Sequence, residues 1–202
     1  MKSKVPIPIF DSLENINLPN FNNLDFPFSN SDYVISLAFL KQYNGNKTTF
    51  LCYRKEIEKL LQWSWLIRNS SIITLKRDDI EEYVNFCMKP LKSWIGLRIV
   101  PRFRTINGER KYNPLWRPFV VTMSKAKHKN GEILKKESYK PSQKAIQEIF
   151  VVLGSFYNFC LLEGHVASNP IQTIRQKSKF IRKNQAKAAI RRLSESQWNA
   201  VV

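Results

Sequence analysis

The sequence predicts a mainly α fold: four helices, with a basic, partly β-hairpin insertion between the third helix and the fourth. Three observations predict it. Apolar residues recur at helical spacing in four segments, whereas this spacing is lost between residues 91 and 140. Lysine and arginine gather in that interval and after residue 172, and the formal net charge is +17. With 202 residues, 43% of them hydrophobic, the chain is long enough to bury a core.

The first two helices are expected on either side of Asn44-Gly45-Asn46, which is typical of a helix stop. Helix one should cover about Asp32 to Tyr43. Ser31 is its expected N-cap, because a serine oxygen accepts hydrogen bonds from the free backbone N–H groups of a first turn. Helix two should start near Thr48-Thr49 and carry an apolar stripe on one face.

The last two helices are also bounded by recognisable residues. Helix three is expected from about Lys76 to Lys89, where four acids lie near its start and Pro90 ends it. Acids are favourable there because the helix dipole is positive at its N-terminus. Helix four should begin at Pro141 or Ser142, continue with a wide apolar face, and close at Gly164.

The insertion, residues 91–140, has the pattern of an irregular β-ribbon. Side chains alternate between apolar and basic over Leu97 to Arg104, which predicts a strand. Asn107-Gly108 predicts a tight hairpin turn. Lys111 to Val121 is expected to return as a second strand, at an edge or irregular, because its prolines lack the N–H that a strand ladder needs.

The flanks of the helical domain differ from it in composition. Residues 1–30 are rich in Asn, Pro and Phe and predict an irregular arm, and residues 31–172 form the predicted domain. Residues 173–193 predict a basic, extended or weakly helical linker. Ser194 and Gln197 match a capping box and therefore predict a helix start in residues 194–202, so we expect this chain to be the front part of a longer protein. The arm's aromatic residues are expected to pack on the domain or on a neighbouring protomer: Phe10, Phe21, Phe26 and Phe28.

The positive charge is concentrated in two segments. Residues 91–140 contain thirteen Lys and Arg against three acids, and residues 173–202 contain eight against one. A phosphate backbone is the commonest partner of such an excess. An anionic membrane surface is the rival partner, but it requires a basic amphipathic helix or a lipid anchor, and neither is evident. The distribution therefore predicts a nucleic-acid footprint.

Other functional classes have little support in the sequence. No signal-peptide pattern is present, and no apolar run is judged long enough for a membrane span. The cysteines lie in apolar helical patterns and are expected in the core, and their spacing with the two histidines offers no zinc site. We expect a reducing cytoplasm, no cofactor and no metal. The tryptophans are expected to be core or insertion anchors: Trp63, Trp65, Trp94 and Trp116.

Several motifs occur in the order and spacing of a known family. The second helix opens with Thr48-Thr49 and Tyr53, the third carries Asp79-Ile80, and the fourth carries Phe156-Tyr157-Asn158-Phe159 before Asn169-Pro170. Together they resemble the core-binding, SAM-like domain of tyrosine recombinases, the phage-integrase family, over about residues 31–200. The likeness extends to these residues as well: Tyr83, Leu153, Gly164, the linker stretch Ile174 to Lys179, Arg192-Leu193-Ser194, and Trp116-Arg117-Pro118-Phe119, which is similar to integrases of mobile elements.

The resemblance implies that the full-length protein breaks and rejoins DNA through a phosphotyrosyl link, without a cofactor. The family's catalytic residues belong to a C-terminal domain and include a His-x-x-Arg, which this sequence lacks, so no catalytic residue is assigned. The resemblance implies that residues 194–202 are the start of that catalytic domain, here truncated. The implied role of this chain is to clamp double-stranded DNA, with self-association on DNA and no small-molecule substrate. The chain departs from the family at Lys76, where many relatives have a capping Thr, so Thr74 is considered as the cap instead.

The candidate DNA contacts fall into three groups. In the family's clamp, helix two and helix four present their first turns to the major groove, and the linker crosses the phosphate backbone. We expect Gln143 to contact adenine and Lys144 guanine. The helix candidates are Lys47, Thr48, Thr49, Arg54, Tyr139, Lys140, Ser142, Gln143 and Lys144; the insertion candidates are Arg102, Arg104, Arg117, Lys125 and Lys127; the linker candidates are Arg175, Lys177, Lys179, Arg182 and Lys183.

Two other functions stay open. An RNA-binding module would need aromatic side chains exposed on a sheet for base stacking, and no such sheet pattern is evident. A protein-interaction module would use the Phe-rich arm to bind a neighbouring protomer, with the charge incidental. A complete enzyme has the least support, because the chain offers no His/Cys or metal constellation.

Overall fold

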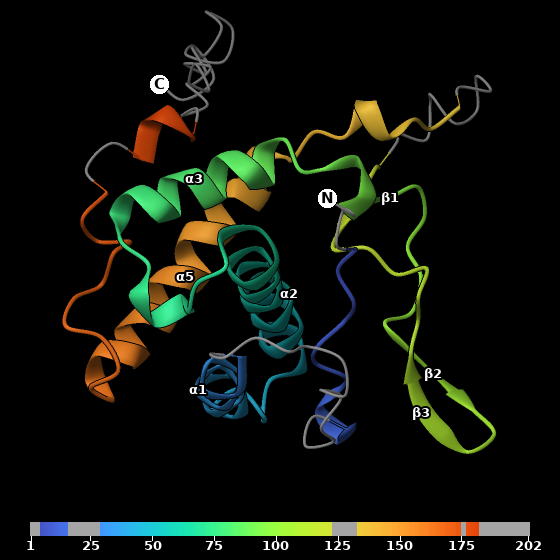
Figure 1. Cartoon of the computed structure of the whole chain (residues 1–202), viewed down its shortest axis with the longest axis horizontal. Coiled ribbons are helices and arrows are strands. Elements are labelled where there is room, and N and C mark those ends of the chain that lie inside the picture. The colour runs from blue at the N-terminus through green and yellow to red at the C-terminus, as the bar shows by residue number, and fades with distance from the viewer. Residues whose placement is uncertain (1–4, 16–28, 123–132, 175–176, 182–202) are drawn as a thin grey trace, which may run out of the picture.

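The computed structural model describes residues 5–15, 29–122, 133–174 and 177–181 (Figure 1). The fold is mainly helical, as the sequence predicts, with four α-helices in these ranges. They are α1 (Ser29–Lys41), α2 (Lys47–Trp63), α3 (Arg77–Met88) and α5 (Gln143–Leu162). Single 3₁₀ turns occur between or beside them, at Leu13–Asn15, Ile72–Thr74, Lys92–Trp94, Lys136–Ser138 and Lys177–Lys179.

The expected helix boundaries are largely confirmed, with differences at two caps. Asn46 caps α2 and accepts a hydrogen bond from Thr49 N at 3.0 Å. The expectation that Ser31 caps the first helix is wrong, because α1 already begins at Ser29. Thr74 does not cap α3, because its hydroxyl donates to the Ser71 carbonyl at 2.8 Å.

Helix α5 is the central core helix. Ser142 is its N-cap and accepts from Ala145 N at 3.1 Å, and Gly164, with φ of 74°, follows its end. Contrary to the sequence-based expectation, α5 is long and apolar enough to cross a membrane by length and composition. Eight of its side chains are buried inside the protein, which is typical of the core helix of a folded domain: Ile146, Ile149, Phe150, Val152, Leu153, Phe156, Tyr157 and Cys160.

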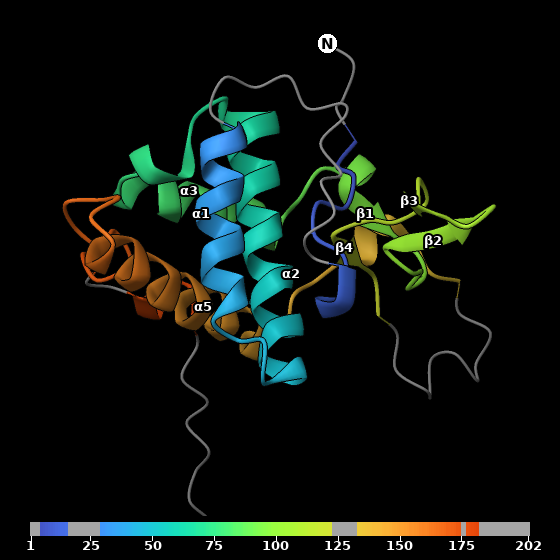
Figure 2. The same ribbon diagram turned by 90° about the horizontal axis from the view of Figure 1, so that it is seen from below.

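Helices α1 and α2 run side by side in opposite directions, and α5 crosses both (Figure 2). Phe39 of α1 lies at the crossing. Its ring is 5.6 Å from that of Tyr53 in α2 and 5.2 Å from that of Phe156 in α5. The four tryptophans expected as anchors are buried, as are Cys87 and Cys160, while Cys52 is half-buried.

The buried carboxylate of Asp32 ties α1 to the segment after α2. It accepts hydrogen bonds from Trp65 Nε1 at 2.8 Å, from Ile72 N at 3.0 Å, and from Ser71 Oγ. Trp65 belongs to a π-helical turn, Ser64–Arg68, that continues α2 and ends at Asn69 in the left-handed conformation. Burial raises the pKa of the Asp32 carboxyl above its usual value, although the hydrogen bonds oppose this change.

The two ends of the insertion lie side by side, next to the helices. β1 (Ile95–Gly96) pairs in parallel with β4 (Phe119–Val120), and between them β2 (Phe103–Ile106) pairs antiparallel with β3 (Glu109–Tyr112). Figure 1 shows this hairpin projecting away from the helices.

The predicted hairpin turn is confirmed, since Asn107 and Gly108 have φ of 52° and 79°. The two strands are shorter than the sequence predicts and are displaced toward the turn: β2 shares only Phe103 and Arg104 with the strand expected over Leu97 to Arg104, and β3 begins at Glu109, before the expected Lys111. The ladder starts only after Pro101 and stops before Pro114, because proline lacks the N–H that continued pairing would use.

The first part of the expected arm belongs to the folded domain. Ile9 and Phe10 are buried, and the Phe10 ring stacks on Tyr33 with the ring centroids 5.2 Å apart. Ile9 N donates to Glu58 Oε1 at 2.9 Å, and Gln62 Nε2 donates to the Ile7 carbonyl at 2.7 Å. The domain therefore includes residues 5–15, and the boundary expected at residue 30 is wrong for this segment. Phe21, Phe26, Phe28 and the helix start expected at 194–202 lie outside the described residues.

Candidate nucleic-acid interface

The starts of α2 and α5 lie on the same side of the molecule. Figure 2 shows the beginning of α5 beside the first half of α2, at the lower edge of the view. An ion pair joins the two helices there, with Lys55 Nζ and Glu148 Oε2 3.4 Å apart. The ion pair joins the middle of α2 to the first third of α5, and the two helix starts that the sequence predicts as groove contacts face the same side.

Several candidate side chains at these starts are available to a partner. Lys47, Lys140 and Lys144 are exposed, and no acidic side chain among the described residues forms an ion pair with them. The other candidates at the two starts are also at least partly exposed: Thr48, Thr49, Ser142 and Gln143. Thr49 N and Ala145 N are already used by the caps. First-turn N–H groups that have no hydrogen-bond partner within the helix favour anions. The first-turn N–H groups other than Thr49 N and Ala145 N therefore add to the positive potential at the starts of α2 and α5.

Arg54 does not belong to this surface. Its Nη1 donates to the Asp11 carbonyl at 2.6 Å, and its guanidinium lies over the Phe50 ring. Burial, together with the neighbouring Arg102 cation, lowers the pKa of Arg54 to about 10. The prediction of Arg54 as a DNA contact is wrong because its side chain is directed into the N-terminal segment.

Tyr139 is also removed from the candidate set. Its ring packs edge-on against Phe119, with the ring centroids 5.5 Å apart, and burial raises the pKa of its hydroxyl. The partly buried side chain therefore packs against the core beside the insertion.

The insertion candidates separate into internal and exposed residues. Arg102 forms an ion pair with the buried Glu58, and its guanidinium lies 4.7 Å from the centre of a Trp116 ring. Burial raises the pKa of the Glu58 carboxyl, although Arg102 acts in the opposite direction. Arg117 is half-buried, donates to the Pro114 carbonyl at 2.7 Å, and has its pKa lowered by burial. Arg104 stays exposed, whereas Lys125 and Lys127 lie outside the described residues.

The beginning of the linker is docked on the helices. Ile174 and Phe180 are buried, and the rings of Phe180 and Phe150 lie 5.9 Å apart. Lys179 Nζ forms an ion pair with Glu81 Oε2 at 2.7 Å, and Lys177 Nζ lies 5.8 Å from the Phe150 ring centre. Both lysines therefore already have partners in the protein. Arg175, Arg182 and Lys183 lie outside the described residues.

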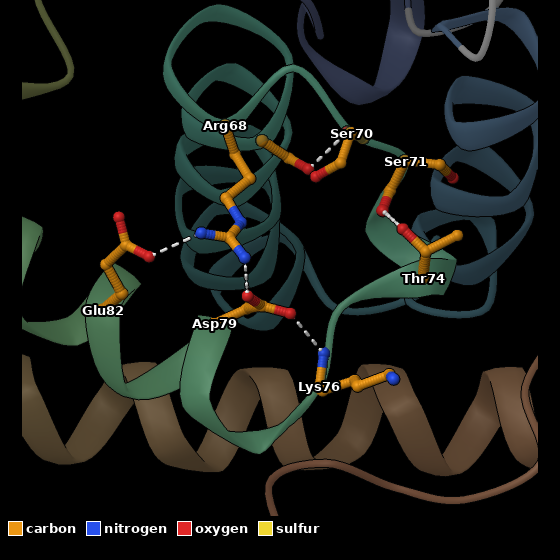
Figure 3. Close-up of polar contacts among 8 residues, drawn as sticks. Arg68, Ser70, Ser71, Thr74, Lys76, Asp79 and Glu82 are labelled. Carbon is orange, nitrogen blue, oxygen red and sulfur yellow. Dashed lines mark hydrogen bonds and ion pairs between the residues drawn. The ribbon is translucent and has the colours of Figure 1, made fainter.

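The first turn of α3 carries the acidic side chains Asp78 and Asp79, in contrast to the basic starts of α2 and α5. In Figure 3, Arg68 lies between two acids of α3: its Nη1 is 2.8 Å from Glu82 Oε2, and its Nη2 contacts Asp79. Asp79 also accepts from Lys76 N at 2.8 Å, which closes the first turn of the helix. Arg68 is thus neutralised by acids of α3.

Sequence reasoning missed the internal charge network because its members are distant along the chain. Arg110 forms a two-point ion pair with Asp11, and Arg102 and Ile9 both bond to Glu58. The available signal was the position of Glu58 and Lys59 between the apolar residues Ile57 and Leu60, since charged residues are rarely buried unless they are paired.

Comparisons with known proteins add no identification: no protein-family model, no curated protein and no solved structure matches this chain. Within the described ranges, no three His, Cys, Asp or Glu side chains gather closely enough to hold a metal ion.

Proposed function

We propose that this chain is the DNA-binding part of a site-specific tyrosine recombinase, an integrase of a mobile element. The order of the described elements supports this proposal: helices α1, α2 and α3 come first, then the insertion, then α5, as expected for a core-binding, SAM-like domain with an insertion before its fourth helix. Strand exchange belongs, in that family, to a C-terminal catalytic domain. The role of this chain is to hold duplex DNA at the recombination site in the cytoplasm, with self-association on the DNA.

The carrying observation is the pair of helix starts on one side of the molecule. Lys47 opens α2, and Lys140 and Lys144 flank the start of α5, all three exposed and without an ion-pair partner among the described acids. Lysine ammonium groups and helix N-termini both favour phosphate, so their combination supports binding to a nucleic-acid backbone. Gln143 and Lys144 are placed at the helix start from which major-groove contacts are made in helix-based DNA recognition.

Salt-dependent binding tests this proposal. The affinity of the chain for a random-sequence duplex is measured between about 50 and 200 mM NaCl, because each phosphate contact contributes about 0.9 to the slope of log K against log salt. The double variant Lys47→Ala/Lys144→Ala should reduce that slope by about 1.8. The matched control, Arg77→Ala/Lys89→Ala, removes the same charge from exposed positions at the two ends of α3 and should leave the slope nearly unchanged.

Two results of the salt titration would count against DNA binding through these helix starts. An absence of duplex binding at low salt, or equal slopes for the wild type and the Lys47→Ala/Lys144→Ala variant, contradicts the proposal.

The RNA-binding alternative has weaker support. Base stacking requires an aromatic platform. Tyr112 is the one aromatic side chain exposed in the part of the chain that the structure describes. The protein-interaction alternative loses one anchor, because Phe10 packs inside its own chain.

A further inference from the structure

The two faces of the β2–β3 hairpin have different environments. Side chains alternate between the faces of a strand, so Phe103, Thr105, Arg110 and Tyr112 share one face. On this inner face Phe103 is 3% exposed and Arg110 is bonded to Asp11, whereas Thr105 and Tyr112 are exposed. The opposite, outer face is entirely exposed and consists of Arg104, Ile106, Glu109 and Lys111.

Two cations stand directly opposite each other on the outer face. Arg104 and Lys111 are cross-strand partners in the ladder. Like charges in this position destabilise a strand pair. Arg104 Nη2 donates to Asn113 Oδ1 at 2.7 Å, and Lys111 pairs with Glu109 at 2.8 Å in an exposed ion pair that contributes little. A hydrogen-bond acceptor or an anion placed over the pair would relieve the repulsion.

Buried acids hold the hairpin at two points, at its base through Arg102 and near its turn through Arg110. Glu58 holds Arg102, and Asp11 holds Arg110, with side-chain exposures of 0% and 4% for the two acids. These contacts neutralise the two arginines and anchor the ribbon against α2 and the N-terminal segment. The ribbon therefore projects in one fixed orientation and presents its outer face.

The dimensions of such a ribbon match one groove of DNA. Two paired strands lie about 4.8 Å apart, and with their side chains they fill roughly 10 Å. The major groove of B-DNA is about 12 Å wide and accepts a two-stranded ribbon, whereas the minor groove is only about 6 Å wide. The surrounding insertion, with thirteen bases and three acids, has the charge that a groove lined by phosphates requires.

We propose that the β2–β3 hairpin is a second, sequence-reading DNA element, whose outer face enters the major groove and directs Arg104 to the O6 and N7 acceptors of a guanine, with Lys111 beside it. The inference rests on the proposed function, since it adds a base-reading contact to a duplex held by α2 and α5. Arg102 and Arg110 have the different role of fixing the ribbon.

Duplexes in which single guanines lack the N7 acceptor of the major groove test the hairpin proposal. The probe is the sequence most enriched by the wild-type chain from a random pool of duplexes about three helical turns long. Its guanines are replaced one at a time by 7-deazaguanine, which lacks N7 but leaves the minor groove and the phosphates unchanged. At one or more guanines the wild type should bind roughly 10-fold more weakly, as expected for a lost specific contact.

Two double variants show whether this loss of affinity depends on the hairpin. Arg104→Ala/Lys111→Ala should bind the enriched duplex more weakly and lose the sensitivity to 7-deazaguanine at those guanines. Arg77→Ala/Lys89→Ala, with the same charge removed from α3, should keep the wild-type sensitivity. Unchanged thermal unfolding of the hairpin variant verifies its fold, which is expected because both side chains are exposed.

Failure of the hairpin and failure of the proposed function give different results. If the pool yields no preferred sequence, or if the hairpin variant keeps the wild-type sensitivity at every guanine, the hairpin proposal is overturned while duplex binding stands. If the wild type binds no duplex at low salt, both proposals are overturned.

Discussion

Asp11 and Arg110, ninety-nine positions apart in the sequence, form a two-point ion pair with N–O distances of 2.7 and 2.9 Å. This pair joins the N-terminal segment to the hairpin. Asp11 also accepts from Ser12 N at 2.8 Å through its side chain, and its carbonyl accepts from Arg54. One buried residue thus connects the N-terminal segment, α2 and β3.

Replacing Asp11 by Ala should destabilise the fold, because Arg110 loses its partner and Ser12 N loses an acceptor. We expect the free energy of unfolding to fall by about 1–3 kcal/mol, less than for a fully buried pair because water reaches the Arg110 side chain. Urea unfolding measures the change. Glu109→Ala, which breaks the exposed pair with Lys111, is the control and should cost at most about 0.5 kcal/mol; similar losses for the two variants contradict the prediction.

Phe10→Ala should show that the N-terminal segment is part of the core. The side chain is 1% exposed and stacks on Tyr33, so its removal should lower the free energy of unfolding by about 3–5 kcal/mol. Val5→Ala, at an exposed position of the same segment, should change it by less than about 0.5 kcal/mol. Size-exclusion chromatography distinguishes the alternative, since a changed oligomeric state with unchanged stability would place the Phe10 ring against a neighbouring copy.

Asp32 should make the protein less stable as the pH rises. Burial raises the pKa of this carboxyl in the folded state above its ordinary value of 3.8, so the folded state binds the proton more tightly than the unfolded state. The contribution of Asp32 to stability is then greatest below pH 3.8 and is lost as the pH rises from there through the raised pKa.

The measurement is urea unfolding of the wild type and of Asp32→Asn across that pH range. The wild type should lose stability relative to the variant as the pH increases and reach a plateau above the raised pKa. A difference that grows in the opposite direction would refute the prediction.

Glu81→Gln should strengthen binding to random duplex. Lys179 is held by Glu81, and loss of the carboxylate frees the ammonium group for phosphate. One additional phosphate contact should steepen the salt slope by about 0.9. Glu163→Gln, which removes an exposed acid after α5, controls for net charge. Equal slopes for Glu81→Gln and Glu163→Gln mean that Lys179 was not released to bind phosphate.

The helices were predictable because their signals are local. The apolar period of α5, the cap at its start and Gly164 at its end all lie within one segment, and helical contacts connect residues three or four positions apart. The turn at Asn107-Gly108 was predictable for the same reason, since two consecutive residues with positive φ are what Asn-Gly favours.

The roles of the basic residues were predictable only where no distant partner exists. Lys47 and Lys144 stay exposed at helix starts, as expected. Arg54 and Arg102 turned inward because Asp11 and Glu58 attract them, and these partners lie 43 and 44 positions away. A count of charges along the sequence assigns every lysine and arginine to the surface, whereas tertiary pairing removes some of them from it.

The parallel pairing of β1 with β4 determines how this protein can vary in length. Parallel neighbours cannot be joined by a tight turn and need a crossover of about a dozen residues or more. Excising residues 103–112 leaves twelve residues between Gly96 and Phe119, and its cut ends already meet, since Asn113 N donates to the Arg102 carbonyl at 2.7 Å. The hairpin is therefore an insertion whose loss would leave the crossover intact but would remove the partner of the buried Asp11 carboxylate. Related chains should gain, lose or lengthen the ribbon at Arg102 and Asn113 while the helices keep their positions.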